Sequence, residues 1–110
     1  MKKLFITGIG TDIGKTIVSA VVVEALQADY WKPIQAGIPT DTDTVKALVS
    51  NKDIFFHNEL YKLKTPASPH AAAVIDGVKI LLSDIKTPST KNNIVIEGAG
   101  GCMVPLNDHE

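Results

Sequence analysis

The stretch that decides the fold of this chain reads Gly-Ile-Gly-Thr-Asp-Ile-Gly-Lys-Thr, residues 8–16. It follows the short apolar run 4–6 and precedes a long apolar run that starts at Ile17, an order that predicts strand, glycine-rich turn and helix. Such a turn directs backbone N–H groups and a helix N-terminus at one point, where a phosphate can bind. Lys15 would place a charge on the β- and γ-phosphates, and the hydroxyl of Thr16 would reach a Mg²⁺ ion. The stretch therefore predicts a phosphate-binding loop.

The spacing of the glycines makes this loop a variant. The usual loop has four residues between its first glycine and the Gly-Lys-Ser/Thr end, whereas five residues separate Gly8 from Gly14. The sequence also does not match the dinucleotide-binding pattern Gly-x-Gly-x-x-Gly, because the third glycine of that pattern would fall at Ile13. Asp12 fits a carboxylate near a helix start, and beside phosphates it would have to face a metal or a substrate amine.

The composition indicates one small α/β domain. The chain has 110 residues, 45% of them hydrophobic, and a net charge of −1. No run of lysines or arginines marks a surface that binds nucleic acid, and no apolar stretch is long enough to cross a membrane. We therefore expect the protein to bind neither nucleic acid nor a membrane. Cys102 is the single cysteine, which indicates a reducing compartment, and we interpret the protein as cytoplasmic.

Alternating apolar runs predict a P-loop NTPase-like α/β fold, with a mostly parallel sheet flanked by helices. The first helix is apolar nearly all round, so we expect it to be covered on more than one face. Thr42 is the predicted cap of the second helix. The predicted strands are 3–7, 30–34, 58–63 and 93–97; the predicted helices are 16–27, 43–50, a segment from 71 onward, and 79–86.

Polar side chains follow three of the predicted strands. The phosphate loop follows the strand that ends near Ile6, Lys32 follows Trp31, and Glu97 follows Ile96. Ligands bind at the carboxyl ends of parallel strands, so these groups would converge if the strands are neighbours. The alternatives are a lysine that extends to solvent and a solvated glutamate.

Two aspartates, Asp41 and Asp43, lie just past a turn. Either can be a carboxylate at a helix N-terminus or a ligand of Mg²⁺, which prefers hard oxygen donors. His70 in the segment Ser68-Pro69-His70 is interpreted as a turn residue, and Cys102 as a small buried residue without a basic neighbour.

Five motifs, in order along the chain, resemble those of dethiobiotin synthetases. Their order makes the resemblance specific, although no single motif decides it. They are the variant loop with its flanks at 5–16, Lys-Pro-Ile-Gln-Ala-Gly at 32–37, Thr-Asp at 42–43, Ser-Pro-His-Ala-Ala at 68–72, and Val-Ile-Glu-Gly-Ala-Gly-Gly at 95–101 with Val-Pro-Leu at 104–106.

The resemblance implies an enzyme that joins CO₂ to 7,8-diaminononanoate. A carbamate forms on one amine, ATP phosphorylates it, and the second amine closes the ring. Lys15 and Lys32 would be catalytic, and Thr16, Asp43 and Glu97 would hold Mg²⁺. The nucleotide-binding residues that it implies are Asp12, Ile13, Gly14, Lys15, Thr16, Ile17, Asp43, Glu97, Gly98, Ala99 and Gly100.

Length and two departures set this chain apart from that family. Family members are roughly twice as long, so residues 1–110 would be the N-terminal part of a single ATP-binding α/β domain of a homodimer, and we expect this part alone to turn over little substrate. Ala36 stands where the family often has a serine or threonine that helps to bind substrate. The short interval after Gly37 leaves Asp41 open as the metal ligand in place of Asp43.

Three other functions remain open from the sequence. One is a synthetase of the cobyrinate amidotransferase type, which shares the loop style and the use of Mg²⁺ and ATP. Another is a nucleotide switch that positions a partner, although such proteins carry a lysine where this chain has Gly10. The third is a scaffold that binds nucleotide without catalysis.

Overall fold

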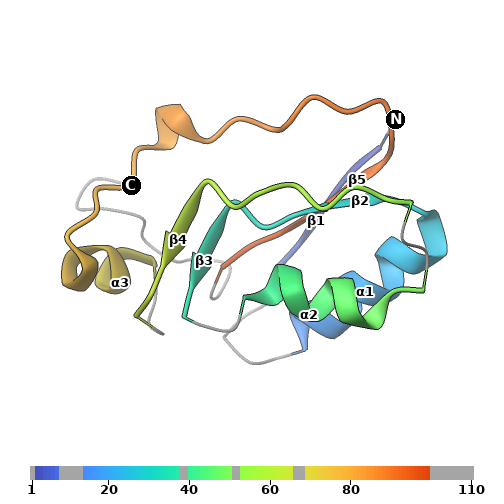
Figure 1. The fold of residues 1–110 in the computed structure, drawn as a ribbon. Coiled ribbons are helices and arrows are strands. Elements are labelled where there is room, and N and C mark those ends of the chain that lie inside the picture. Colours follow the sequence, from blue (N-terminus) through green and yellow to red (C-terminus); the bar gives the residue numbers. More distant parts are fainter. Residues whose placement is uncertain (1, 8–13, 38–39, 51–52, 66–68, 100–110) are drawn as a thin grey trace.

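The computed structural model of the chain describes residues 2–7, 14–37, 40–50, 53–65 and 69–99. Strands alternate with helices, as predicted, and the fold is α/β (Figure 1). The elements, in chain order, are β1 (Lys3–Ile6), α1 (Lys15–Leu26), β2 (Asp29–Trp31), β3 (Ile34–Ala36), α2 (Asp41–Leu48), β4 (Tyr61–Leu63), α3 (Pro69–Asp76), the 3-10 turn η1 (Leu82–Asp84) and β5 (Ile94–Glu97).

The described strands form two parallel sheets. The larger has the order β1-β5-β2, so β5, the last strand in the sequence, lies between the first two. In its register Ile6 pairs with Glu97 and Trp31 pairs with Ile96. The smaller sheet pairs β3 with β4. Because all strands of the larger sheet run the same way, their carboxyl ends meet at one edge.

The predicted strand 30–34 is wrong as a single element, because the chain changes sheet at Lys32 and Pro33. β2 ends at Trp31 and β3 begins at Ile34. Pro33 has no N–H to donate to a ladder, which favours a break at this point. Its carbonyl instead accepts hydrogen bonds of 2.9 Å from the backbone N–H groups of Leu60 and Tyr61, which lead into β4. Lys32 therefore lies at the junction of the two sheets.

Helix α1 begins directly after Gly14, whose left-handed φ of 83° turns the chain into the helix. The helix packs against β5 and β1 and lies beside α2 (Figure 1). Its buried side consists of Ser19, Ala20 and Val23. The sheet and α2 thus cover α1 on two sides, as expected, but part of its apolar surface is open among the described residues, because Ile17, Val18 and Val21 are each about half exposed or more.

Two other predicted elements differ from the structure. Helix α2 begins at Asp41, and its cap is Thr40 rather than Thr42: the Thr40 hydroxyl accepts a hydrogen bond of 3.2 Å from the N–H of Asp43. The predicted helix 79–86 is reduced to η1. Short helices need tertiary packing of an apolar face, and within that segment Ile80 alone is fully buried among the described side chains.

The buried side chains form two apolar clusters, one for each sheet. Figure 1 shows α3 against β3 and β4, while α1 and α2 cover the larger sheet. No helix among the described residues is long and apolar enough to cross a membrane. The first cluster contains Ala20, Val23, Ala28, Tyr30, Val45, Val49, Ile54 and Val95. The second contains Ile34, Leu63, Ala72, Ala73 and Ile80.

Candidate functional site

Glu97 lies at the carboxyl end of the central strand β5 and is 1% exposed. The pairing of β5 with β1 continues past it, because the N–H of Gly98 donates to the carbonyl of Ile6 at 2.9 Å. The hydroxyl of Thr16, in the first turn of α1, donates to Glu97 Oε2 at 3.3 Å. The start of α1 and the end of β5 are thus brought together.

Lys32 lies at the centre of a cluster of polar side chains that also contains Thr16, Asp41 and Glu97. Its Nζ atom donates to Oε2 of Glu97 at 2.9 Å, and it lies 2.7 Å from Oδ2 of Asp41. A third hydrogen bond of 3.2 Å reaches the carbonyl of Gly98. The side chain is 5% exposed, so the alternative of a lysine that extends to solvent is wrong. The ammonium of Lys32 thus offsets the charge of two carboxylates where water is largely excluded.

The structure brings Asp41, and not Asp43, into the cluster. Burial raises the pKa of Asp41, but the hydrogen bond and charge of Lys32 outweigh it, so the pKa lies below its ordinary value and the carboxylate is ionised at neutral pH. Asp43 is exposed on α2, and the contact that places it is its backbone N–H on Thr40. The two positions differ because Thr40 caps the helix, which makes Asp41 its first residue and Asp43 its third.

Gln35 is a site residue that the sequence did not reveal. Its Oε1 accepts a hydrogen bond of 2.8 Å from the backbone N–H of Asp41, and its Nε2 donates to the carbonyls of Ala36 (3.1 Å) and Gly37 (3.4 Å). The side chain is buried. Gln35 therefore holds the start of α2, where Asp41 reaches Lys32.

Tyr30 is a second residue that sequence reasoning missed. Its hydroxyl donates to Oε1 of Glu97 at 2.9 Å, and the residue is 0% exposed. Burial, and then the negative charge of Glu97, raise the pKa of Tyr30, so it keeps its proton at every ordinary pH. In the sequence, nothing distinguishes Tyr30 from a core residue of a buried strand.

The remaining predicted site residues lie near the cluster or outside the described residues. Lys15, Thr16 and Ile17 form the first turn of α1 after Gly14. A Cβ atom on Gly98 would come within 3.0 Å of the Phe5 ring, so backbone and ring approach closely there. Ala99 packs against the second core cluster. The predicted residues outside the described part are Asp12, Ile13 and Gly100.

Comparison with known proteins identifies the family of the chain. A protein-family model described as an AAA domain matches residues 2–110. The chain belongs to this AAA domain family. It is also similar to curated proteins named ATP-dependent dethiobiotin synthetase BioD. That of Christiangramia forsetii is 61% identical over 111 residues, which are 99% of this chain and 54% of the relative.

Two further relatives are also named ATP-dependent dethiobiotin synthetase BioD. That of Cytophaga hutchinsonii is 56% identical over 110 residues, covering 98% of this chain and 53% of the relative. That of Rhodopseudomonas palustris is 50% identical over 107 residues, which are 96% of this chain and 51% of the relative. The chain spans about half the length of the curated relatives it matches.

The donor atoms of the cluster suit a hard cation. Thr16, Asp41 and Glu97 offer one hydroxyl and two carboxylates, and Mg²⁺ prefers oxygen ligands and usually keeps several waters. No group of three or more histidine, cysteine, aspartate or glutamate side chains gathers among the described residues. The one hydroxyl and two carboxylates of the cluster are thus ligands of the kind that Mg²⁺ takes.

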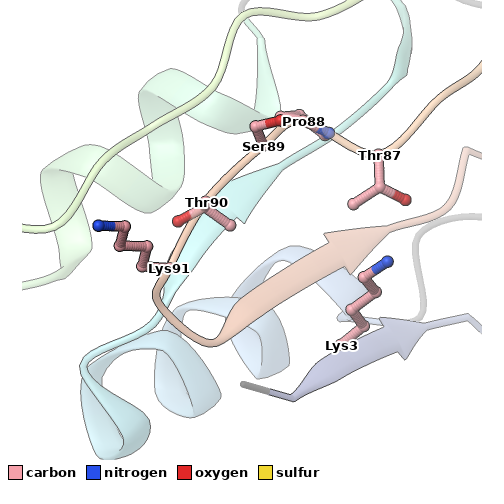
Figure 2. A pocket seen from close by; sticks show the side chains of 6 residues that line it. All are labelled: Lys3, Thr87, Pro88, Ser89, Thr90 and Lys91. Atoms are coloured by element: carbon pink, nitrogen blue, oxygen red, sulfur yellow. The ribbon is translucent and has the colours of Figure 1, made fainter.

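A hollow lies at the other end of the sheet from the cluster. Figure 2 shows its lining, which consists of Lys3 at the start of β1 and residues 87–91 of the segment before β5. Lys3 pairs with Ile94 at the amino end of the strands, whereas Glu97 ends β5. The hollow is thus separate from the cluster in this AAA domain chain.

Proposed function

We propose that this chain provides the phosphate-binding and metal-binding part of an ATP-dependent dethiobiotin synthetase. The observation that carries the proposal is the buried ammonium of Lys32 between Asp41 and Glu97, beside the Thr16 hydroxyl at the start of α1. The names of the similar relatives support the choice of reaction.

The metal site proposed here consists of Thr16, Asp41 and Glu97, with Asp43 as the alternative that the resemblance implies. Mg²⁺ bound there would neutralise charge on the β- and γ-phosphate oxygens. Lys15 would bind the same phosphates, and the backbone N–H groups that follow Gly14 would receive them at the N-terminus of α1.

The reaction that we propose needs cations more than a general base. A carbamate oxygen of the substrate attacks the γ-phosphorus of ATP, and the bond to the bridging oxygen of ADP breaks. The second amine then attacks the carbamate carbon, loses a proton and displaces phosphate. Both steps move negative charge, and the buried Lys32 would stabilise it more strongly than an ammonium in water could.

The proposal extends to the assembly and its location. By resemblance, the whole enzyme would be a homodimer in the cytoplasm, with 7,8-diaminononanoate, CO₂ and ATP as its substrates. The sequence motifs Lys32-Pro33 and Ser68-Pro69-His70 favour dethiobiotin synthesis over a related amidotransferase-type synthetase.

A chimeric enzyme tests the proposed function. Residues 1–110 would replace the matching part of the Christiangramia forsetii relative, and phosphate release would be measured with ATP, bicarbonate and 7,8-diaminononanoate. We expect release that needs both co-substrates and that falls by at least about 100-fold in Lys32→Ala. If the relative is active while the folded chimera is not, or if release does not need the diamine, the proposal is wrong.

A further inference from the structure

The two carboxylate oxygens of Glu97 have different partners. Oε2 accepts hydrogen bonds from Lys32 (2.9 Å) and Thr16 (3.3 Å), the groups assigned to the phosphate-transfer site. Oε1 accepts a hydrogen bond of 2.9 Å from the hydroxyl of Tyr30. Tyr30 therefore occupies the oxygen that faces away from Lys32 and leaves the other one directed at the site.

Tyr30 is itself held firmly in the core. Its ring belongs to the first apolar cluster and lies 6.4 Å from that of Phe56, and the residue is 0% exposed. Its backbone N–H donates to Phe55 at 3.1 Å, and its carbonyl accepts from His57 at 2.9 Å. The hydroxyl is thus a donor in a fixed place, and a carboxylate bonded to it has restricted rotation.

We propose that Tyr30 is a positioning residue that orients Glu97 for its role toward Mg²⁺ and nucleotide. This rests on the proposed function, because it assigns Tyr30 to the same site. Ligating carboxylates are commonly held by an outer hydrogen bond, and loss of such a bond lowers metal affinity or activity by roughly 10- to 100-fold. Phenylalanine would retain the packing of Tyr30 and lose its bond to Glu97.

The first test is Tyr30→Phe in the 110-residue chain, with Tyr61→Phe as the matched control. Tyr61 also loses a hydroxyl with two partners, Asp84 (3.3 Å) and the N–H of Leu81 (3.2 Å), outside the cluster. ATP binding would be measured by calorimetry over a series of Mg²⁺ concentrations. We expect Tyr30→Phe to raise the Mg²⁺ concentration for half-maximal binding by about 10-fold or more and Tyr61→Phe to leave it unchanged.

A double-mutant cycle with Glu97→Gln shows whether the effect passes through Glu97. We expect Tyr30→Phe to add no further loss in the Glu97→Gln background. An equal loss in both backgrounds, or a Tyr30→Phe chain that binds like Tyr61→Phe, overturns the inference and leaves the proposed function intact. If the unsubstituted chain binds no Mg²⁺ and ATP, the proposed function fails, and the inference fails with it.

A spectroscopic measurement covers the case in which Tyr30→Phe does not fold. The chain has two tyrosines, so 3-fluorotyrosine incorporated into Tyr61→Phe labels Tyr30 alone. We expect its ¹⁹F resonance to shift when Mg²⁺ and ATP are added, and to shift much less in the Glu97→Gln background. A resonance that does not respond in the nucleotide-bound Tyr61→Phe chain overturns the inference.

Discussion

The Nζ atom of Lys32 lies 2.7 Å from Oδ2 of Asp41. Lys32 directly follows β2, whereas Asp41 is the first residue of α2. This ion pair ties the start of α2 to the junction of the two sheets. Because the same ammonium also binds Glu97 at 2.9 Å, a single side chain joins α2, β5 and the β2–β3 connection.

Lys32→Met is expected to lower the free energy of unfolding by about 3–5 kcal/mol. The substitution leaves Glu97, which is 1% exposed, without its cation and beside a second carboxylate. Urea unfolding followed by circular dichroism measures the loss. Lys32→Met combined with Glu97→Gln should recover part of it, because the buried negative charge is then gone; a double variant less stable than Lys32→Met would contradict this account.

Asp41→Asn and Asp43→Asn form a matched pair for the metal assignment. Both lie in the first turn of α2, so both lose a similar favourable charge at the helix N-terminus, a few tenths of a kcal/mol. We expect Asp41→Asn to weaken Mg²⁺-dependent ATP binding by at least about 10-fold and Asp43→Asn to weaken it by less than about 2-fold. Calorimetry at fixed nucleotide and varied Mg²⁺ gives both values. The reverse order would assign the metal to Asp43.

Thr40→Ala should destabilise the chain by about 1 kcal/mol, because it removes the cap of α2. Thr42→Val is the control. The Thr42 hydroxyl is buried and has no hydrogen-bond partner among the described residues, so a methyl group in its place should be neutral or stabilising. Thermal unfolding should show a drop of several degrees for Thr40→Ala alone. A larger drop for Thr42→Val would restore Thr42 as the cap.

Asp29 makes the stability of the chain depend on acid pH. Burial raises the pKa of Asp29, but its hydrogen bonds lower that pKa by more than burial raises it, so the net shift is downward. The donors are Thr90, His57, Asn92 and the N–H of Phe55. A lowered folded-state pKa contributes stability above the unfolded value of about 3.9, and this contribution is lost as the pH falls through the folded-state pKa.

Asp29→Asn tests that dependence. We expect a loss of about 1.5–3 kcal/mol at pH 7, since the hydrogen bonds to a buried charge, among them the one that joins Asp29 to His57 at 3.0 Å, become weaker. The difference between the variant and the unsubstituted chain should shrink as the pH falls below about 3.9. Urea unfolding at several pH values measures it, and a difference that grows with acid would contradict the assignment.

Local sequence patterns were enough to predict the parts of the fold that depend on local chemistry. Gly14, the last glycine of the glycine-rich stretch, directly precedes α1, and the apolar runs at 4–6 and 94–96 form paired parallel strands. The convergence of Thr16, Lys32 and Glu97 follows from that parallel order, because their strands end at one edge.

Contacts between distant residues account for what was missed. Tyr30 and Glu97 are 67 positions apart, and no local pattern distinguishes this tyrosine from an ordinary core residue. The choice between Asp41 and Asp43 depends on where α2 starts, which Thr40 and the buried Gln35 decide through single hydrogen bonds. The division of 30–34 into two strands depends on the partners β5 and β4, which lie far along the chain.

The position of β1 at the edge of the larger sheet bears on how the chain behaves at high concentration. Among the described strands β1 pairs on one side with β5, and Phe5 on it is 62% exposed. Ile17 and Val21 on α1 are exposed to the same extent. A strand edge that carries an exposed apolar side chain is a template for adding strands from other copies. Light scattering by concentrated solutions should therefore rise steeply, and a charged residue in place of Phe5 should suppress that rise.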